Sequence, residues 1–106
     1  MADKIKDFKV LLETSGIPFR YFEWKTKPRA FPFGAFVFVS RTALKADGGN
    51  YYSTDRMRVE LYCDKKDIAA ENSLEAVFDE NGIIYEKSEE YISDEKMFEI
   101  IYETEI

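Results

Sequence analysis

The sequence predicts a single α+β domain over residues 1–106, with two helices on one face of a largely antiparallel sheet in the order α-β-β-β-α-β-β. Two segments carry apolar residues at helical spacing, and five others carry the aromatic, branched or alternating residues typical of strands. A chain of 106 residues with 45% apolar composition is long enough to form one core. We therefore expect one undivided domain.

The first helix is predicted at residues 3–15. Its apolar residues share one side at helical spacing, while charged residues occupy the rest of its surface. Gly16 follows the last periodic residue, where a left-handed conformation satisfies the final helix carbonyls, and Pro18 prevents continuation. The opening segment, MADKIKDFKVLLE, is charged throughout, which is not typical of a signal peptide.

Residues 17–40 hold eight aromatic residues in two runs, separated by the segment KTKPRAFP. Two strands joined by a proline-containing loop explain this pattern. In the second run, Phe36 and Phe38 alternate with Val37 and Val39, which predicts a strand covered on both faces. The loop is either a solvated connection or a contact arm, because it concentrates positive charge in an acidic chain. Its basic residues are Lys25, Lys27 and Arg29.

Residues 41–50, RTALKADGGN, are predicted to form a turn because Asp-Gly-Gly-Asn is a strong turn signal. They carry no phosphate-binding glycine motif. Residues 51–63 then alternate cleanly, with Arg56 and Arg58 on the polar face, which predicts a strand. Its apolar face consists of Met57, Val59, Leu61 and Cys63.

The second helix is predicted between Asp67, a suitable N-cap, and Gly82, a suitable terminator. Its apolar stripe consists of Ala70, Leu74, Val77 and Phe78. We expect its outer face to carry Glu71, Glu75 and Asp79, whose like charges repel at successive i,i+4 positions. No residue of the helix itself neutralises this acidic stripe. It is either a solvated face or a surface for a basic partner.

Residues 83–106 are predicted to form two strands joined by SEEYISDEK. In the last strand Phe98, Ile100, Tyr102 and Ile106 share a face. The opposite face carries the acidic residues Glu99, Glu103 and Glu105. Acidic residues on this face pair favourably with arginines on an adjacent strand. We expect them to lie opposite Arg56 and Arg58.

Composition argues against several classes of function. The chain has 15 basic and 21 acidic residues, a formal charge of −6 and an isoelectric point near 4.7, which disfavours duplex DNA or an anionic membrane as the main partner. It has no histidine, so histidine-activated nucleophiles and imidazole metal ligands are excluded. Cys63 is interpreted as a small buried residue. We expect no catalytic residue, metal site, cofactor or membrane span.

Residues 46–106 resemble the C-terminal part of small minor tail proteins encoded by long-tailed phages and prophages of Gram-positive bacteria. The segments that carry the resemblance are RVELYCDKKD (58–67), NGI (81–83), YEKSEEYI (85–92) and EKMFEIIYETEI (95–106). The first predicted helix and its GIPFRY exit extend the resemblance over most of the chain. Such proteins are similar in size and element order to tail-completion or tail-terminator proteins, whose subunits form a ring, commonly sixfold.

The resemblance implies a non-enzymatic protein that completes the tail and joins it to the head. It would assemble in the host cytoplasm and reside in the tail or neck of the virion, in contact with other tail and neck proteins. A head-to-tail ring needs two complementary patches on each subunit. Our hypothesis for these patches pairs Lys25, Lys27 and Arg29 with Glu71, Glu75 and Asp79 of a neighbour.

Two other functions remain compatible with the sequence. The acidic second helix fits an inhibitor or antitoxin-like protein that masks a basic partner. The aromatic runs and the basic loop fit a single-strand nucleic-acid binder, although most of these aromatic residues alternate as core residues do.

Overall fold

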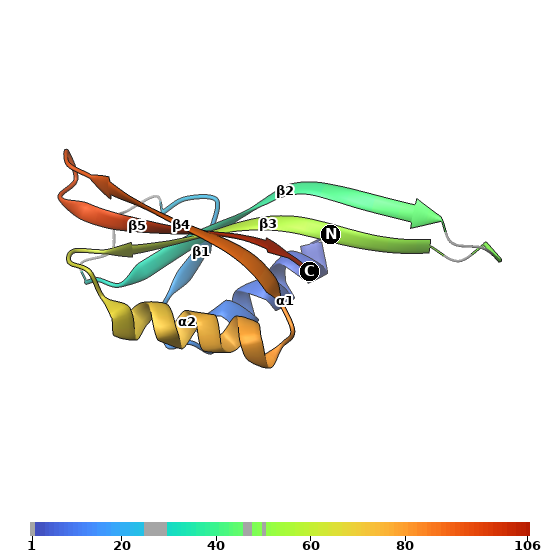
Figure 1. The fold of residues 1–106 in the computed structure, drawn as a ribbon, viewed down its shortest axis with the longest axis horizontal. Coiled ribbons are helices and arrows are strands. Elements are labelled where there is room, and N and C mark those ends of the chain that lie inside the picture. Colours follow the sequence, from blue (N-terminus) through green and yellow to red (C-terminus); the bar gives the residue numbers. More distant parts are fainter. Residues whose placement is uncertain (1, 25–29, 46–47, 50) are drawn as a thin grey trace.

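The computed structural model describes residues 2–24, 30–45, 48–49 and 51–106 (Figure 1). Its five strands form one sheet in the order β1-β2-β3-β5-β4. Both helices lie on the same face of this sheet, as predicted (Figure 1). The elements are α1 (Ala2–Glu13), β1 (Phe19–Tyr21), β2 (Phe33–Lys45), β3 (Tyr51–Cys63), α2 (Ile68–Glu80), β4 (Ile84–Ile92) and β5 (Met97–Glu105).

The sheet is mixed rather than wholly antiparallel. β1 pairs with β2 in parallel, with Phe19 opposite Gly34, whereas the β2–β3, β3–β5 and β4–β5 pairs are antiparallel. A parallel pair needs a connection of about a dozen residues, and residues 22–32 are long enough to return the chain to the same end of the sheet. A Cβ at Gly34 would overlap the ring of Phe19, so the close approach of these two strands requires glycine.

Two predicted connections are partly strand. β2 continues to Lys45, so residues 41–45, which we expected in the turn, pair with β3. β4 continues to Ile92, so residues 88–92 belong to a strand rather than to the connection before β5. In both cases pairing with a neighbouring strand outweighs the local preference for a turn or loop, because the backbone N–H and C=O groups form their hydrogen bonds in the sheet whatever the side chains are.

The predicted glycines after the helices and the predicted Asp67 cap are confirmed, although α1 ends at Glu13 rather than at residue 15. Gly16 adopts a φ of 88° after α1, and Gly82 adopts a φ of 65° after α2. Asp67 caps α2, since its Oδ1 accepts a hydrogen bond of 3.0 Å from the Ala70 backbone N–H. The Ile83 N–H then bonds the Phe78 carbonyl at 2.8 Å, which closes the helix and directs the chain into β4.

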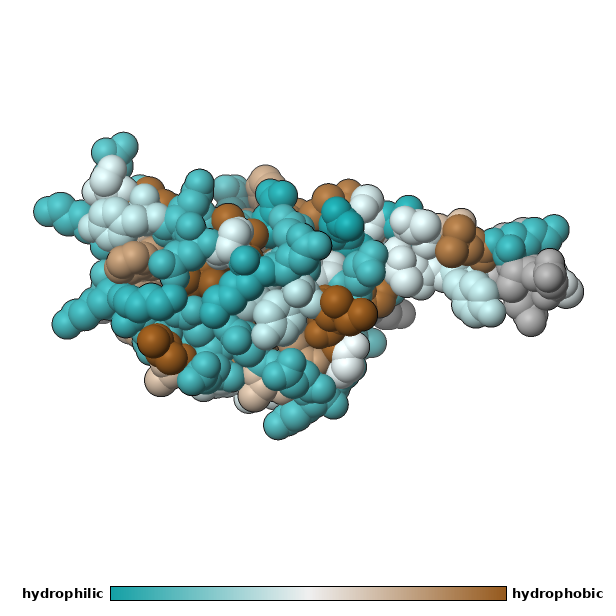
Figure 2. All heavy atoms as spheres, viewed as in Figure 1, coloured by the Kyte–Doolittle hydropathy of each residue, from teal (hydrophilic) through white to brown (hydrophobic). Residues whose placement is uncertain are grey.

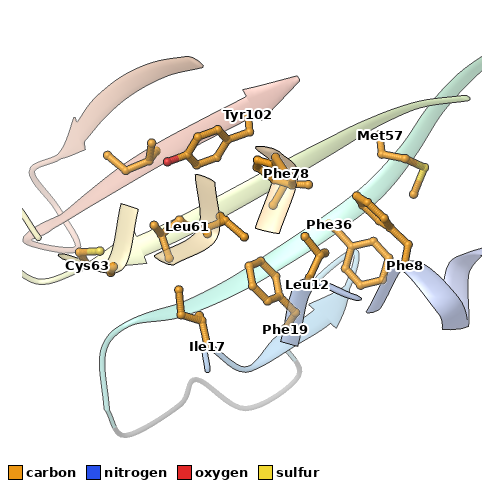
Figure 3. Close-up of a cluster of buried hydrophobic side chains, with 14 residues drawn as sticks. Phe8, Leu12, Ile17, Phe19, Phe36, Met57, Leu61, Cys63, Phe78 and Tyr102 are labelled. Carbon is orange, nitrogen blue, oxygen red and sulfur yellow. The ribbon is translucent and has the colours of Figure 1, made fainter. Parts of the chain in front are cut away.

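The core fills the space between the sheet and the two helices (Figure 3). The sheet contributes alternate residues of β2, β3 and β5, among them Phe36, Leu61 and Tyr102, each at most 1% exposed. Phe8 and Leu12 of α1 and Phe78 of α2 close the core from the other side (Figure 3). Cys63 is buried in this layer, which confirms its interpretation as a small core residue.

The molecule is elongated because β2 and β3 run beyond the core as a two-stranded ribbon (Figure 1). Its extents are 52 × 26 × 24 Å and its radius of gyration is 15.0 Å, against about 13 Å for a compact chain of this length. The ribbon starts beyond Val39, where a register shift between Phe38 and Ser40 interrupts the β2–β3 ladder. We call the described residues 40–45 and 51–56 the arm. It stands out from the body in the space-filling view (Figure 2).

Candidate subunit interface

The acidic residues of α2 lie against β4 instead of facing away from the protein. Glu71 is 3% exposed, and it forms ion pairs with Lys66 at 2.8 Å and with Lys87 of β4 at 2.7 Å. Glu75 accepts hydrogen bonds from Lys87 at 2.7 Å and from the Tyr102 hydroxyl at 2.7 Å. The chain therefore supplies its own counter-charges for these two carboxylates.

The pKa values in this cluster move in the directions that ion pairing requires. Burial disfavours the charged form of Glu71, but hydrogen bonds from Lys66 and Lys87 outweigh it and lower the Glu71 pKa. Hydrogen bonds to Glu71 and Glu89 raise the pKa of Lys66. The cluster is thus fully charged near neutral pH and holds α2 to β4.

The predicted outer acidic face of α2 is wrong for two of its three members. Glu71 and Glu75 have partners within the chain, because the 3.6-residue period places them toward β4 and the lysine that neutralises them is supplied by another element. Asp79 is exposed. The inhibitor hypothesis depended on the acidic stripe and loses that support. The basic half of the hypothesis, Lys25, Lys27 and Arg29, lies outside the described residues.

The predicted pairing of arginines with the acidic row is confirmed. Arg56 lies opposite Glu105 and Arg58 opposite Glu103 in the β3–β5 register. The Arg58 Nε donates to Glu103 Oε1 at 2.7 Å. These pairs occupy the sheet face that the helices leave uncovered.

A carboxyl cluster on the same uncovered face has no counterpart in the sequence predictions. The Tyr62 hydroxyl lies 2.7 Å from Glu60 Oε2 and 3.1 Å from Glu99 Oε2. Burial, reinforced by the neighbouring Glu60, raises the pKa of Glu99 to about 7. A pattern search could find it only after the strand register is known, since Glu60 and Glu99 are far apart in sequence.

The described residues contain no group of three or more carboxylate, cysteine or histidine side chains placed to hold a metal ion. Burial raises the pKa of the Cys63 thiol to about 11, so this thiol is not an activated nucleophile. Among the described helices, none is long and apolar enough to cross a membrane.

The arm presents exposed apolar side chains far from the core. Leu44 lies directly opposite Tyr52 in the β2–β3 register, and they are 60% and 63% exposed. A two-stranded ribbon is only marginally stable in water on its own. The arm was missed by sequence reasoning because the first of its strands was ended at residue 40, with residues 41–45 assigned to the turn, whereas the second strand was predicted correctly from residue 51. The sequence feature that could have predicted the arm is the run of branched and aromatic residues on each side of Asp-Gly-Gly-Asn, which is typical of a hairpin.

A buried carboxylate fixes the base of the arm to the body. Asp55 is 0% exposed, and it accepts two hydrogen bonds from Arg41, at 2.6 and 3.0 Å. Lys4 of α1 adds an ion pair at 3.0 Å. The Asp55 backbone also exchanges two hydrogen bonds of 2.9 Å with Ile106. The direction of the arm is therefore set by α1 and by the residue that follows β5.

An open groove of about 590 Å³ lies beside the base of the arm. Phe8 and Leu11 of α1 and Ile83 after α2 give it an apolar lining, and Asp7 and Glu105 stand among its polar lining residues. Both acidic residues are exposed.

Comparison with known proteins finds a similar fold in a virion particle. No family model matches the chain, and no curated protein matches it in sequence. A chain in the structure of the virion of a native gene transfer agent (GTA) particle is similar in fold, with a TM-score of 0.57 and 13% identity. The alignment covers 98% of this chain and 87% of that one. A chain of a virion particle thus has a similar overall fold.

Proposed function

We propose that this chain is a non-enzymatic structural subunit of a phage or prophage particle, located in the tail or at the head–tail junction. Copies of it form a ring that completes the tail and joins it to the head. The observation that carries this proposal is the fold shared with a chain of the GTA virion, because the alignment covers nearly the whole chain. The resemblance of residues 46–106 to minor tail proteins supports it from the sequence side.

The shape of the molecule supports an assembly role. An arm with exposed Leu44 and Tyr52 stands out from an otherwise packed domain, and exposed apolar patches commonly mark contact surfaces. Subunits with a projecting element suit head-to-tail contacts, which close into rings when the rotation between neighbours allows it.

Lys25, Lys27 and Arg29 remain part of the proposal as basic residues that contact an acidic surface of a neighbour. Because Glu71 and Glu75 are paired within the chain, the exposed Asp79 is the member of the acidic set that we retain for this contact. Reversing all three basic residues to glutamate should abolish ring formation and leave the monomer folded. Rings of normal size from this variant would remove the basic residues from the interface.

The proposal is tested by deleting the gene from its prophage and inducing the host. We expect particles from the deletion strain to have tails of irregular length or tails unjoined to heads, and complementation in trans should restore them. A deletion that leaves joined tails of uniform length would contradict the proposed role.

A further inference from the structure

We infer that the arm of one subunit docks in the groove beside the arm base of a second copy of this chain. The inference rests on the proposed assembly function and specifies its contact. Leu44 and Tyr52 are the apolar anchors, and the lining formed by Phe8, Leu11 and Ile83 receives them. Large, partly apolar side chains such as tyrosine are common energetic anchors of interfaces.

Charge supports this occupant. Among the described residues of the arm, the exposed charged ones are the cations Arg41, Lys45 and Arg56. Arg41 is paired with Asp55 and Arg56 lies opposite Glu105 within the chain, so Lys45, near the far end of the arm, is the cation that we assign to the contact. Asp55 is buried and paired. The groove instead carries exposed Asp7, while its Glu105 lies opposite Arg56 of its own chain and its Lys4 is engaged by Asp55. Lys45 of one copy beside Asp7 of the next gives attraction between unlike charges.

Geometry requires that the occupant comes from another copy. Arm and groove adjoin at the arm base, where Lys4 contacts Asp55. Six residues of β2 carry the arm outward from Ser40 to Lys45, which places its far end about 17 Å away. The β2–β3 ladder continues to the Lys45–Tyr51 pair, so the arm cannot fold back on its own groove without breaking that ladder. The contact is heterologous and uses a different surface on each partner.

The decisive experiment mixes two defective variants. The arm variant carries Leu44→Asp with Tyr52→Ser, and the groove variant carries Asp7→Arg. All three positions are exposed, so both variants should fold, which circular dichroism and thermal melting verify. The matched control is Ile68→Asp, at 61% exposure on α2 against 60% for Leu44 on the arm.

Size-exclusion chromatography with light scattering gives the readout. We expect the wild type and the Ile68→Asp control to form oligomers that grow with concentration, and each defective variant to stay monomeric. A one-to-one mixture should form dimers and nothing larger, since one intact arm and one intact groove remain. Adding Lys45→Glu to the groove variant should restore its self-assembly by compensating the reversed charge at position 7.

Three results would overturn the arm-to-groove contact: assembly of either variant like the wild type, a mixture that stays monomeric, or a wild type that is monomeric even at about 1 mM. The proposed function is judged separately by incorporation into particles. If both variants enter particles as the wild type does, the virion role stands and this contact falls. If the wild type is absent from particles but the mixture dimerises, the contact stands and the virion role falls.

Discussion

Asp55 is the residue on which the arm depends most. It is fully buried, and its partners come from α1, from β2 and from the residue after β5. Hydrogen bonding from Arg41 outweighs burial and, with the contribution of Lys4, lowers the Asp55 pKa to about 2. A carboxylate in this position is stable only while all its donors stay in place. Sequence reasoning missed Asp55, although the alternation of residues 51–63 places it on the same face as Met57 and Val59; its partners Arg41 and Lys4 become known only from the fold.

Replacing Asp55 with asparagine should lower the free energy of unfolding by about 1 to 3 kcal/mol at pH 7, because Arg41 and Lys4 lose a charged acceptor. The folded-state pKa of about 2 lies below the ordinary 3.8, so the stabilisation is complete above about pH 4 and is lost as the pH falls toward 2. Urea unfolding between pH 2 and 7 measures both effects. The free energy of unfolding of the variant should fall less than that of the wild type as the pH decreases from about 4 to 2. A surface control, Asp94→Asn, should follow the wild type. A variant with the wild-type pH profile would contradict the account.

Glu99 should give the opposite pH dependence. Its folded-state pKa of about 7 exceeds the ordinary 4.5, so its contribution favours the fold below about pH 4.5 and is lost as the pH rises through 7. Glu99→Gln removes the ionisation, and we expect it to stabilise the protein by about 1 to 3 kcal/mol at pH 8 relative to wild type. The gain should shrink toward pH 4.5. An equal gain at both pH values would show that Glu99 is not the titrating group.

At the scale of elements, the sequence predicted the helices best. Their apolar spacing, the Asp67 cap and the glycines at 16 and 82 are local signals, and the structure confirms them. Strand ends were predicted less well, because residues 41–45 and 88–92 are held by pairing with distant strands. The prediction that Glu71 faces away from the protein failed for the same reason. Lys87, which pairs with it, belongs to β4 and comes close to Glu71 only in the tertiary fold.

The cluster between α2 and β4 should matter more to stability than an ion pair on the uncovered sheet face. Lys87→Met keeps much of the side-chain volume but leaves buried Glu71 with one fewer donor, so we expect a loss of about 1 to 3 kcal/mol. The matched control, Arg58→Met, breaks the more exposed pair with Glu103 and should cost about 0 to 1 kcal/mol. Chemical denaturation of both variants at one pH gives the comparison. Equal losses would mean that burial of Glu71 contributes nothing.

In the molecule as a whole, the arm is the main feature that the sequence patterns did not predict. The proposed contact between subunits depends on it. The packed body follows the predicted core of β3, whose apolar face is buried, and that of β5 in part, since Ile100 and Tyr102 are buried while Phe98 and Ile106 are half-buried. The arm and the groove lie outside that core, so hydrophobic periodicity gives no information about them. Only the folded structure shows both features together, with the arm extending the protein to a length of 52 Å and the groove lying at the arm base.

A virion subunit that is present as one ring has a fixed, small copy number per particle. This copy number is measured by mass spectrometry with isotope-labelled peptides of this chain in purified virions and tails. We expect roughly six copies per particle, as a single closed ring would give, and no such peptides in particles from the deletion strain. Absence from wild-type particles would contradict the proposed function, and so would a copy number on the order of hundreds, which a tail tube or capsid shell requires.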